Sequence, residues 1–325
     1  MQGDKTLEQQ YQKLTDREHV LHRPDMYIGS DKLTEDNTFV MEGEGEEKKI
    51  VRRTVDIIPG LYKLVDEAIV NSSDHATRQN KIDKNKEHQH VSYIDIQITE
   101  EGVITVMNDG NGIDIAMHPE HKLWIPEMIF GHLRTSTNYN KDEKKIVGGK
   151  NGFGFKLVLI FSKQGRIETV DHRRKLKYVQ TFSDNLSVIG KPKITKSKSK
   201  PYTKVTFKLD FERFGVEGIT DDIFNILRKR SYDIAAVTEK SVKVRFNNQM
   251  IPIRTFEDYM SLYIGNKASS RRVYEQDGRW EFGVACSPTG EFAQVSFVNG
   301  VYTQKGGKHV DYLMNHIIRK VSAYI

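Results

Sequence analysis

The chain has 325 residues, enough for about two domains, and its 37% hydrophobic and 29% charged residues exclude a disordered, collagen-like or disulfide-stapled protein. The single cysteine, Cys286, excludes an internal disulfide and a cysteine zinc cluster. No apolar run approaches a membrane span and no apolar signal segment opens the sequence, so we expect an intracellular protein without membrane contact. The net charge of +6 permits binding to nucleic acid but does not establish it.

Hydrophobic periodicity separates helices from strands along the chain. Helices are expected at 61–75, 122–133, 155–162 and 221–236, and strands at 51–58, 93–99, 103–108, 176–182, 203–209 and 242–246. The polar stretches 41–53 and 79–90 are expected to form surface loops. The pattern changes near Pro252, after which helices are expected at 256–264 and 309–325 and strands at 280–286 and 293–299. A mostly antiparallel sheet mixed with helices makes the first part an α+β fold.

Glu67 and Asn71 form the first candidate site. They are four positions apart in an expected helix and therefore share one face, with Asp74 in the same sector. The rest of this helix is mostly apolar, so it should be buried, and its polar side chains then need hydrogen-bond or metal partners. A general base beside a magnesium ligand and a polar cluster at a helix end explain this stretch equally well.

The turn 108-NDGNGI-113 follows the second strand of the expected hairpin. Its two glycines permit backbone angles that other residues avoid, and they let a ligand approach the main chain. Asp109 could accept a hydrogen bond from an exocyclic amine such as that of adenine. For this stretch alone, an ordinary Asn-Asp-Gly turn is the better explanation.

The stretch 148-GGKNGFGFK-156 has a Gly-x-x-Gly-x-Gly pattern at the start of a helix. Free N–H groups there can point at phosphate oxygens, and Lys150 and Lys156 add cations. The pattern is not a P-loop, and it is not a dinucleotide fingerprint because Leu157 stands where the third glycine would be. Any nucleotide site here is therefore of another kind.

In this order, the three elements resemble the Bergerat (GHKL) ATPase fold of DNA gyrase, the large heat-shock chaperones, sensor histidine kinases and mismatch-repair ATPases. The segments 23–30, 59–71, 125–145, 297–301 and 306–312 are similar, more narrowly, to the ATPase region of eukaryotic-type type IIA DNA topoisomerases. That resemblance runs from about Tyr11 to the C-terminus. It implies an α/β sandwich with a mostly antiparallel sheet, followed by part of a transducer domain of the ribosomal protein S5 domain 2-like type. The implied division is an N-terminal strap at 1–27, the ATPase domain at 28–251 and a partial transducer at 252–325.

The resemblance also implies roles for individual residues. Glu67 would polarise the water that attacks the γ-phosphate of ATP, and Asn71 would hold the Mg²⁺ that bridges the phosphates. Asp109 would contact the adenine amine, with Thr203 close by. The other implied ATP contacts are Tyr11 of the strap, the run Ser136, Thr137 and Asn138, and the lid residues Lys150, Asn151, Gly152, Phe153, Gly154 and Lys156.

Two positions need separate treatment. His75 stands where many relatives have an asparagine near the phosphates, and both a ligand role and a solvent-facing position at the helix end are open. Relatives also supply a lysine to the γ-phosphate from a Gln-Thr-Lys loop. That role is not assigned to Lys305, because 303-TQK-305 matches an earlier part of the family, and we expect the lysine-bearing loop to lie beyond Ile325. We therefore expect this chain to bind ATP but to hydrolyse it slowly.

The resemblance implies an ATP-operated gate: nucleotide binding would join two copies into a homodimer that captures double-stranded DNA, while DNA cleavage lies outside this chain. A chaperone-like or clamp ATPase of the same fold class is the alternative, and a basic DNA-binding module is a third; 125–145 and 297–312 favour the topoisomerase. We expect a nuclear location, with an organelle or a virus-infected host cell left open.

Four basic stretches lie outside these motifs. A solvated surface is favoured over a DNA contact for each of them: 172–177, 191–200, 228–230 and Arg271-Arg272.

Overall fold

The computed structural model describes residues 13–83, 88–133 and 154–325. Within these ranges, one nine-stranded sheet has the order β11-β10-β3-β4-β9-β5-β6-β7, and β8 also pairs with β6. Its pairs are antiparallel except that of β10 with β3. The strands are β3 (Tyr93–Ile98), β4 (Val103–Asp109), β5 (Ser162–Val170), β6 (Leu176–Ser183), β7 (Val188–Ile189), β8 (Lys193–Lys196), β9 (Tyr202–Leu209), β10 (Lys243–Phe246) and β11 (Gln249–Met250). The expected α+β fold with a mostly antiparallel sheet is confirmed.

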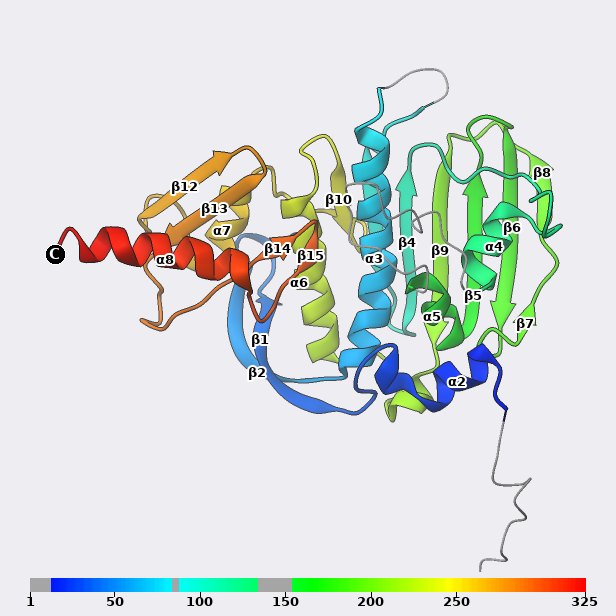
Figure 1. Ribbon diagram of the computed structural model, residues 1–325, viewed down its shortest axis with the longest axis horizontal. Coiled ribbons are helices and arrows are strands. Elements are labelled where there is room, and N and C mark those ends of the chain that lie inside the picture. The colour runs from blue at the N-terminus through cyan, green and yellow to red at the C-terminus, as the bar shows by residue number, and fades with distance from the viewer. Residues whose placement is uncertain (1–12, 84–87, 134–153) are drawn as a thin grey trace, which may run out of the picture.

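Helices cover one face of this sheet, as Figure 1 shows. They are α3 (Pro59–Asn80), α4 (Ile125–Gly131), α5 (Gly154–Ile160) and α6 (Asp221–Val237). Alternate strand residues are buried under them, as Ile104 and Val106 of β4 are, while the residues between these are only half-buried. The core therefore lies between the sheet and this helical layer, and the opposite face of the sheet is open.

Helix α3 carries the candidate residues Glu67 and Asn71. It begins at Pro59, which suits a first helical turn because the N–H that proline lacks would have no partner there. It continues to Asn80 rather than ending near His75. The amide of Asn80 donates to the carbonyl of Val91 at 3.0 Å and accepts from its N–H at 2.8 Å. These two hydrogen bonds tie the end of α3 to the segment that enters β3.

β1 (Thr34–Glu42) and β5 are the longest of the strands that have no counterpart in the sequence prediction. β1 pairs with β2 (Lys49–Ile57) in a separate two-stranded sheet that packs against α6. β5 follows α5 and lies between β9 and β6. The sequence of β5 lacks a clear apolar alternation because only Ile167 of the covered-face residues Gly165, Ile167 and Thr169 is a large apolar residue, while Arg166 and Glu168 occupy the other face. Their position inside a sheet is a tertiary effect, not a local preference.

Smaller elements flank this core. Near the N-terminus, α2 (Asp16–His22) begins with a capping box between Thr15 and Glu18 and contacts α5. Beyond residue 252, α7 (Phe256–Ile264) packs against α6, β2 and the strand β13. The remaining elements are β12 (Arg272–Asp277), β13 (Trp280–Ala285), β14 (Phe297–Val298), β15 (Val301–Tyr302) and α8 (Lys308–Ser322). No helix in the described ranges combines the length and apolar character needed to cross a bilayer.

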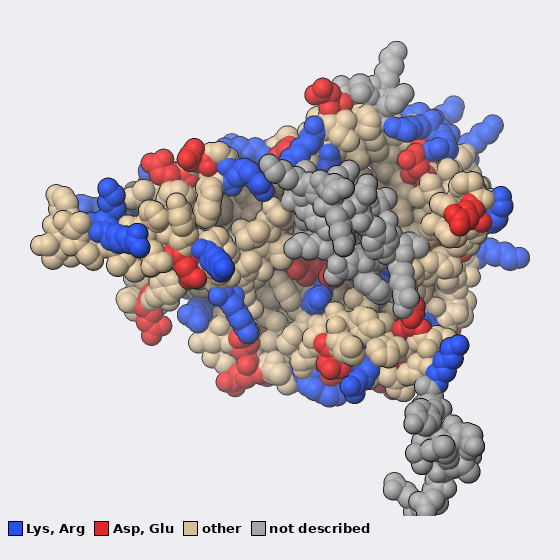
Figure 2. Space-filling model, in the orientation of Figure 1, with Lys and Arg blue, Asp and Glu red and all other residues tan. Residues whose placement is uncertain are grey.

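The basic stretches differ in burial. Pairing of β6 with β8 brings 172–177 and 191–200 together at the surface, where Lys and Arg gather at the upper right of Figure 2. In contrast, Arg228, Lys229 and Arg230 of α6 are only 8%, 3% and 0% exposed. The expectation that 228–230 is solvated is therefore wrong. The physical reason is that carboxylates from other segments and from the same helix compensate their charge inside the protein.

Candidate functional site

The carboxylate of Glu67 lies against Gly154, the first residue of α5. A Cβ atom at Gly154 would stand 2.3 Å from Oε2 of Glu67 and 3.9 Å from Nδ2 of Asn71. The shorter distance is below any real contact, so a residue with a side chain at 154 would push α5 and Glu67 apart. The structure therefore brings the pair Glu67 and Asn71 together with Gly154, which the sequence selected in a separate motif.

Burial changes the chemistry of Glu67. Loss of solvent raises the pKa of its carboxyl group; nearby Asp66 and Asp74 raise it further, whereas Lys63 opposes the shift. A carboxylate whose pKa is raised is a stronger proton acceptor, as a general base requires. Asn71 lies one turn farther along α3 and is exposed, so its amide oxygen is open to a ligand. Carboxylate and amide oxygens are donors that Mg²⁺ prefers, so these residues fit the expected metal-bound nucleotide.

Lys156 occupies the first turns of α5, two residues after Gly154. Lys156 is only 4% exposed, and burial lowers the pKa of its ammonium group to about 8. Near neutral pH the ammonium group therefore remains mostly charged. A cation at the start of this helix can attract a phosphate group, and it becomes easier to neutralise than an exposed lysine.

The end of β4 places Asn108 and Asp109 on opposite faces of the sheet. Asn108 is 3% exposed, and it follows the alternation of Ile104 and Val106 on the helix-covered face. Its neighbours across the sheet are Ile94 on β3 and Thr203 on β9. Its Nδ2 donates to the carbonyl of Asp109 at 2.8 Å, which leaves its Oδ1 as the acceptor for another group.

The carboxylate of Asp109 accepts hydrogen bonds from the segment at the start of β3. Its Oδ1 accepts the N–H groups of Ser92 and Tyr93 at 2.7 and 3.0 Å, and its Oδ2 accepts the hydroxyl of Ser92. This placement argues against the expectation that Asp109 contacts adenine beside Thr203. The signal for Asn108 was in the sequence: in an Asp-x-Gly-x-Gly pattern, the first position is two residues before Gly110.

Thr203 is held in place by Thr169, a residue that the sequence analysis did not select. Thr169 on β5 is fully buried; its hydroxyl donates to the carbonyl of Tyr202 at 2.9 Å, while its oxygen accepts from the N–H of Ile113 at 2.9 Å. Its oxygen lies 3.3 Å from that of Thr203. Since the Thr169 proton is already used, the Thr203 hydroxyl donates to Thr169 and can itself accept from a ligand.

Close packing fixes the turn after β4. A Cβ atom at Gly112 would stand 2.0 Å from the carbonyl oxygen of Val170, and Gly112 has a φ of +68°, so glycine is required there. Asn111 accepts from the N–H of Gln89 at 2.6 Å and donates to Gln79 of α3 at 3.1 Å. The turn is therefore pinned between the end of α3 and the end of β5.

His75 is one turn beyond Asn71 on α3, and its ring is largely buried rather than solvent-facing. Its Nε2 is inaccessible to solvent and has no hydrogen-bond partner in the part of the chain that the structure describes. Burial lowers its pKa to about 4, with help from Arg78 and opposition from Asp109. The imidazole is therefore neutral near pH 7.

Eight predicted residues lie outside the described residues, and the structure does not place them. They are Tyr11, Ser136, Thr137, Asn138, Lys150, Asn151, Gly152 and Phe153. The described part of the chain contains no cluster of three or more His, Cys, Asp or Glu side chains that could hold a metal ion by themselves.

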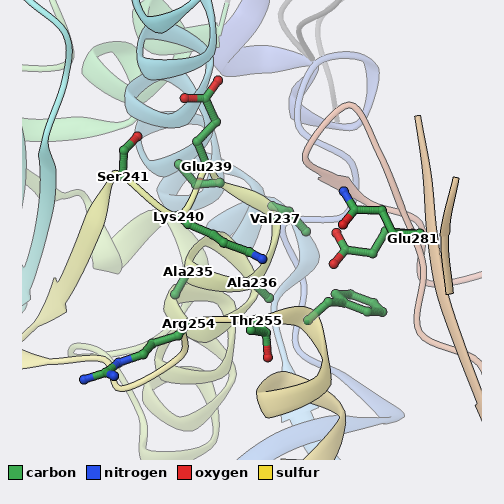
Figure 3. A pocket seen from close by; sticks show the side chains of 12 residues that line it. Ala235, Ala236, Val237, Glu239, Lys240, Ser241, Arg254, Thr255 and Glu281 are labelled. Atoms are coloured by element: carbon green, nitrogen blue, oxygen red, sulfur yellow. The ribbon is translucent and has the colours of Figure 1, made fainter. Parts of the chain in front are cut away.

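A separate hollow of about 580 Å³ opens between the end of α6 and the start of α7 (Figure 3). Residues 235–241 form one wall, and Arg254, Thr255, Phe256, Gln276 and Glu281 form the rest. In Figure 3, Lys240 reaches into it while Glu239 and Arg254 point away. It shares no residue with the site around Glu67, so it is not the candidate site.

Comparison with known proteins agrees with this geometry. Residues 56–213 match the family model described as histidine kinase-, DNA gyrase B- and HSP90-like ATPase, and residues 255–325 match that of DNA gyrase B. DNA topoisomerase 2 of Candida glabrata is 41% identical over an alignment 341 residues long, which covers 99% of this chain and 23% of the relative. The chain spans about a fifth to a quarter of the length of the curated relatives it matches.

Solved structures extend the similarity to the fold. The ATPase region of Saccharomyces cerevisiae topoisomerase II has a TM-score of 0.87 and 41% identity, covering 97% of this chain and 81% of that one. The ATPase and transducer domains of DNA topoisomerase II from Balamuthia mandrillaris have a TM-score of 0.88 and 37% identity, covering 98% and 79%.

Proposed function

Because the chain belongs to the family of ATPase regions of eukaryotic-type type II DNA topoisomerases, we propose that it binds ATP with Mg²⁺ and hydrolyses it to operate a gate for DNA. The observation that carries this proposal is the contact of Glu67 with Gly154 beside Asn71. It joins a half-buried base, an exposed amide and the start of a helix at one point. The chaperone-like or clamp alternative is not favoured, because the relatives named above are topoisomerases.

Each described residue has a part in this proposal. Glu67 accepts a proton from the attacking water, since burial raises the pKa of its carboxyl group. Asn71 offers its amide oxygen to Mg²⁺, and Lys156 attracts phosphate. When bound, the metal neutralises charge that develops on the phosphates. Asn108 accepts a hydrogen bond from the adenine amine, and Thr203 lies beside it across the sheet.

The residues outside the described ranges complete the proposal by resemblance alone. Ser136, Thr137 and Asn138 contact ribose and phosphates. The lid residues Lys150, Asn151, Gly152 and Phe153 enclose the triphosphate with Gly154, and Tyr11 of the strap reaches the partner's nucleotide. We propose the division into a strap at 1–27, an ATPase domain at 28–251 and a partial transducer at 252–325, which is compatible with the two matched families.

Dimerisation and DNA capture belong to the same proposal. Nucleotide binding joins two copies, and the closed pair holds a double-stranded DNA segment while the rest of the enzyme passes it through a break. The named relatives are eukaryotic, which supports a nuclear location. Size-exclusion chromatography with and without a non-hydrolysable ATP analogue tests the gate: the analogue should convert monomer to dimer, and a monomer at saturating analogue would contradict it.

The catalytic assignment is tested with Glu67→Gln, which keeps the shape of the side chain and removes the base. We expect turnover to fall at least about 100-fold, because a positioned base contributes roughly 10²–10⁴-fold, while affinity for ATP stays within a few-fold. The matched control is Glu212→Gln, because Glu212 is exposed and its contact with Lys163 is far from α3 in sequence. Equal loss of turnover and affinity in Glu67→Gln would show that Glu67 is structural.

A further inference from the structure

A buried ionic group joins α3, α6 and the turn between β14 and β15. Its centre is Arg230 of α6, which is completely buried. Its Nε donates to Oδ1 of Asp66 on α3 at 2.6 Å, and its Nη2 donates to the carbonyl of Gly300 in the turn at 3.1 Å. One guanidinium group therefore holds two segments that lie far apart in the sequence.

The third nitrogen of Arg230 is held less firmly. Nη1 has no hydrogen-bond partner among the described residues, and its nearest carboxylate oxygen is Oδ2 of Asp233, at 3.9 Å. That oxygen already accepts from Nζ of Lys229 at 2.9 Å, and Oδ1 of Asp233 accepts from the hydroxyl of Tyr259 at 2.6 Å. Both oxygens of Asp233 are therefore engaged by Lys229 and Tyr259, and Asp233 faces Arg230 at 3.9 Å without a hydrogen bond to it.

The second matched region supplies much of the surrounding wall. Tyr259 comes from α7, and the ring of Tyr302 on β15 lies 3.9 Å from Nζ of Lys229. Burial alone would lower the pKa of Arg230, but the carboxylate of Asp66 and other negative neighbours raise it, so the guanidinium stays charged. The positive charges of Lys229 and Arg230 on α6 are therefore stabilised by groups from α3 and from residues beyond position 252.

Helix α3 presents different faces to the candidate site and to this group. Asp66 directly precedes Glu67, and Ser73 follows Asp66 by seven residues, so Asp66 and Ser73 share a face. A Cβ atom at Gly300 would lie 3.9 Å from Oγ of Ser73, which places the turn along this face. Around the helix axis, Glu67 lies roughly 100° and Asn71 roughly 140° from Asp66. A shift of Asp66 therefore moves Glu67, because both belong to one helical turn.

Stability is a poor explanation for such a group. Burying two opposite charges costs solvation free energy that their attraction often fails to exceed, so a buried ion pair is weak evidence for stabilisation. Arginine suits this position because its planar fork holds donors to Asp66 and Gly300 at fixed angles, whereas lysine has a single nitrogen. Arg230 is therefore placed to respond to changes in the relative positions of α3, Asp233 and the β14–β15 turn.

We infer that Arg230 is a positioning residue that couples the site around Glu67 to the β14–β15 turn. Through Asp66 it fixes α3 against that turn, so that nucleotide binding on one face of α3 changes the turn on the other. By linkage, the turn also sets the position of Glu67. This inference rests on the proposed nucleotide site, but it concerns residues that do not touch the nucleotide.

Hydrogen exchange of residues 296–303, with and without a non-hydrolysable ATP analogue and Mg²⁺, tests the inference on the full chain. In the unmodified protein, the analogue should slow exchange of this segment by about fivefold or more, the lower range of allosteric coupling. Asp66→Asn, which keeps the shape but removes the charge, and Arg230→Lys, which keeps the charge but removes the fork, should abolish this slowing. Both should still bind the analogue.

The matched control is Arg53→Lys. Arg53 Nη2 makes a 2.7 Å ion pair with Asp222 at the start of the same helix α6, but at an exposed position. This control should keep the full nucleotide-dependent slowing. Steady-state ATPase assays give a second readout: Asp66→Asn and Arg230→Lys should lower kcat by about tenfold with little change in KM, because a displaced base slows the reaction without weakening nucleotide binding.

Each outcome decides the matter. Nucleotide-dependent slowing that persists in both variants would overturn the inference, as would its absence from the unmodified protein that binds the analogue. Variants that fold but no longer bind the analogue would show that the pair holds the site itself, which also overturns it. If the unmodified protein fails to bind the analogue, the proposed function fails instead. Asp66→Asn keeps the test valid if Arg230→Lys does not fold.

Discussion

Gly154 and Glu67 touch at the point where α5 begins against α3, with no room for a methyl group between them. Gly154→Ala should therefore displace the carboxylate or α5. Since a misplacement of about 1 Å can cost 10²-fold in rate, we expect turnover of ATP to fall by one to two orders of magnitude. Steady-state ATPase assays measure this effect.

Gly218→Ala is the matched control for that variant, because a Cβ atom at Gly218 meets nothing within 4 Å. It should leave turnover unchanged. Unchanged turnover in Gly154→Ala as well would mean that the contact with Glu67 relaxes without consequence, and the site geometry would lose its main support.

Asn108 and Asp109 should separate ligand recognition from stability. Asn108→Ala removes the acceptor on the covered face, so it should weaken ADP binding and reduce the preference for ADP over GDP. Asp109→Ala removes the acceptor of the N–H groups of Ser92 and Tyr93, which should lower the unfolding free energy by about 1 kcal/mol, because water can replace the acceptor at the exposed Ser92. Calorimetric titration with both nucleotides and urea unfolding measure the two effects. The reverse pattern would restore Asp109 as the adenine contact.

The fold and most of the site elements were predictable from sequence because they depend on local patterns. The helix with Glu67 and Asn71 follows from its apolar spacing, and the glycine of the α5 start from its motif. The sequence selected Asp109 as the adenine contact, whereas the structure favours Asn108, one position earlier. That single step moves a side chain to the other face of a strand, and the chemistry of an aspartate gave no hint of its face.

Other features depended on partners distant in the sequence. The run 228–230 has the composition of a solvated surface. Arg230 is nevertheless buried, because the carboxylate of Asp66 and the carbonyl of Gly300 accept its hydrogen bonds inside the protein. Thr169 carries no motif, and only the pairing of β5 with β9 reveals that it holds Thr203. The contacts of Arg230 and the contact of Thr169 with Thr203 join residues far apart in the sequence, so no local sequence pattern predicts either of them.

Lys156 should make nucleotide affinity dependent on pH. Burial lowers its pKa to about 8, so the free protein loses this charge as the pH rises from 7 to 9. A bound phosphate favours the charged form, so binding above pH 8 must take up a proton and affinity must fall. Titration calorimetry in buffers of different ionisation enthalpy should detect this uptake. Lys156→Met should bind nucleotide more weakly, and its affinity should not depend on pH in this way. The control Lys208→Met should behave as the unmodified protein. Proton uptake that persists in Lys156→Met would assign the uptake to another group.

His75 should contribute a pH dependence to folding stability. Its pKa is about 4 in the folded protein against 6.5 for an unperturbed histidine, and burial is the main cause. Between these values the unfolded chain binds more protons, so the unfolding free energy should fall as pH drops from 6.5 towards 4, by up to about 3 kcal/mol. His75→Asn cannot bind this proton. Urea unfolding from pH 4.5 to 7 should therefore show a shallower fall in this variant than in the unmodified protein, and identical slopes would show that His75 titrates normally when folded.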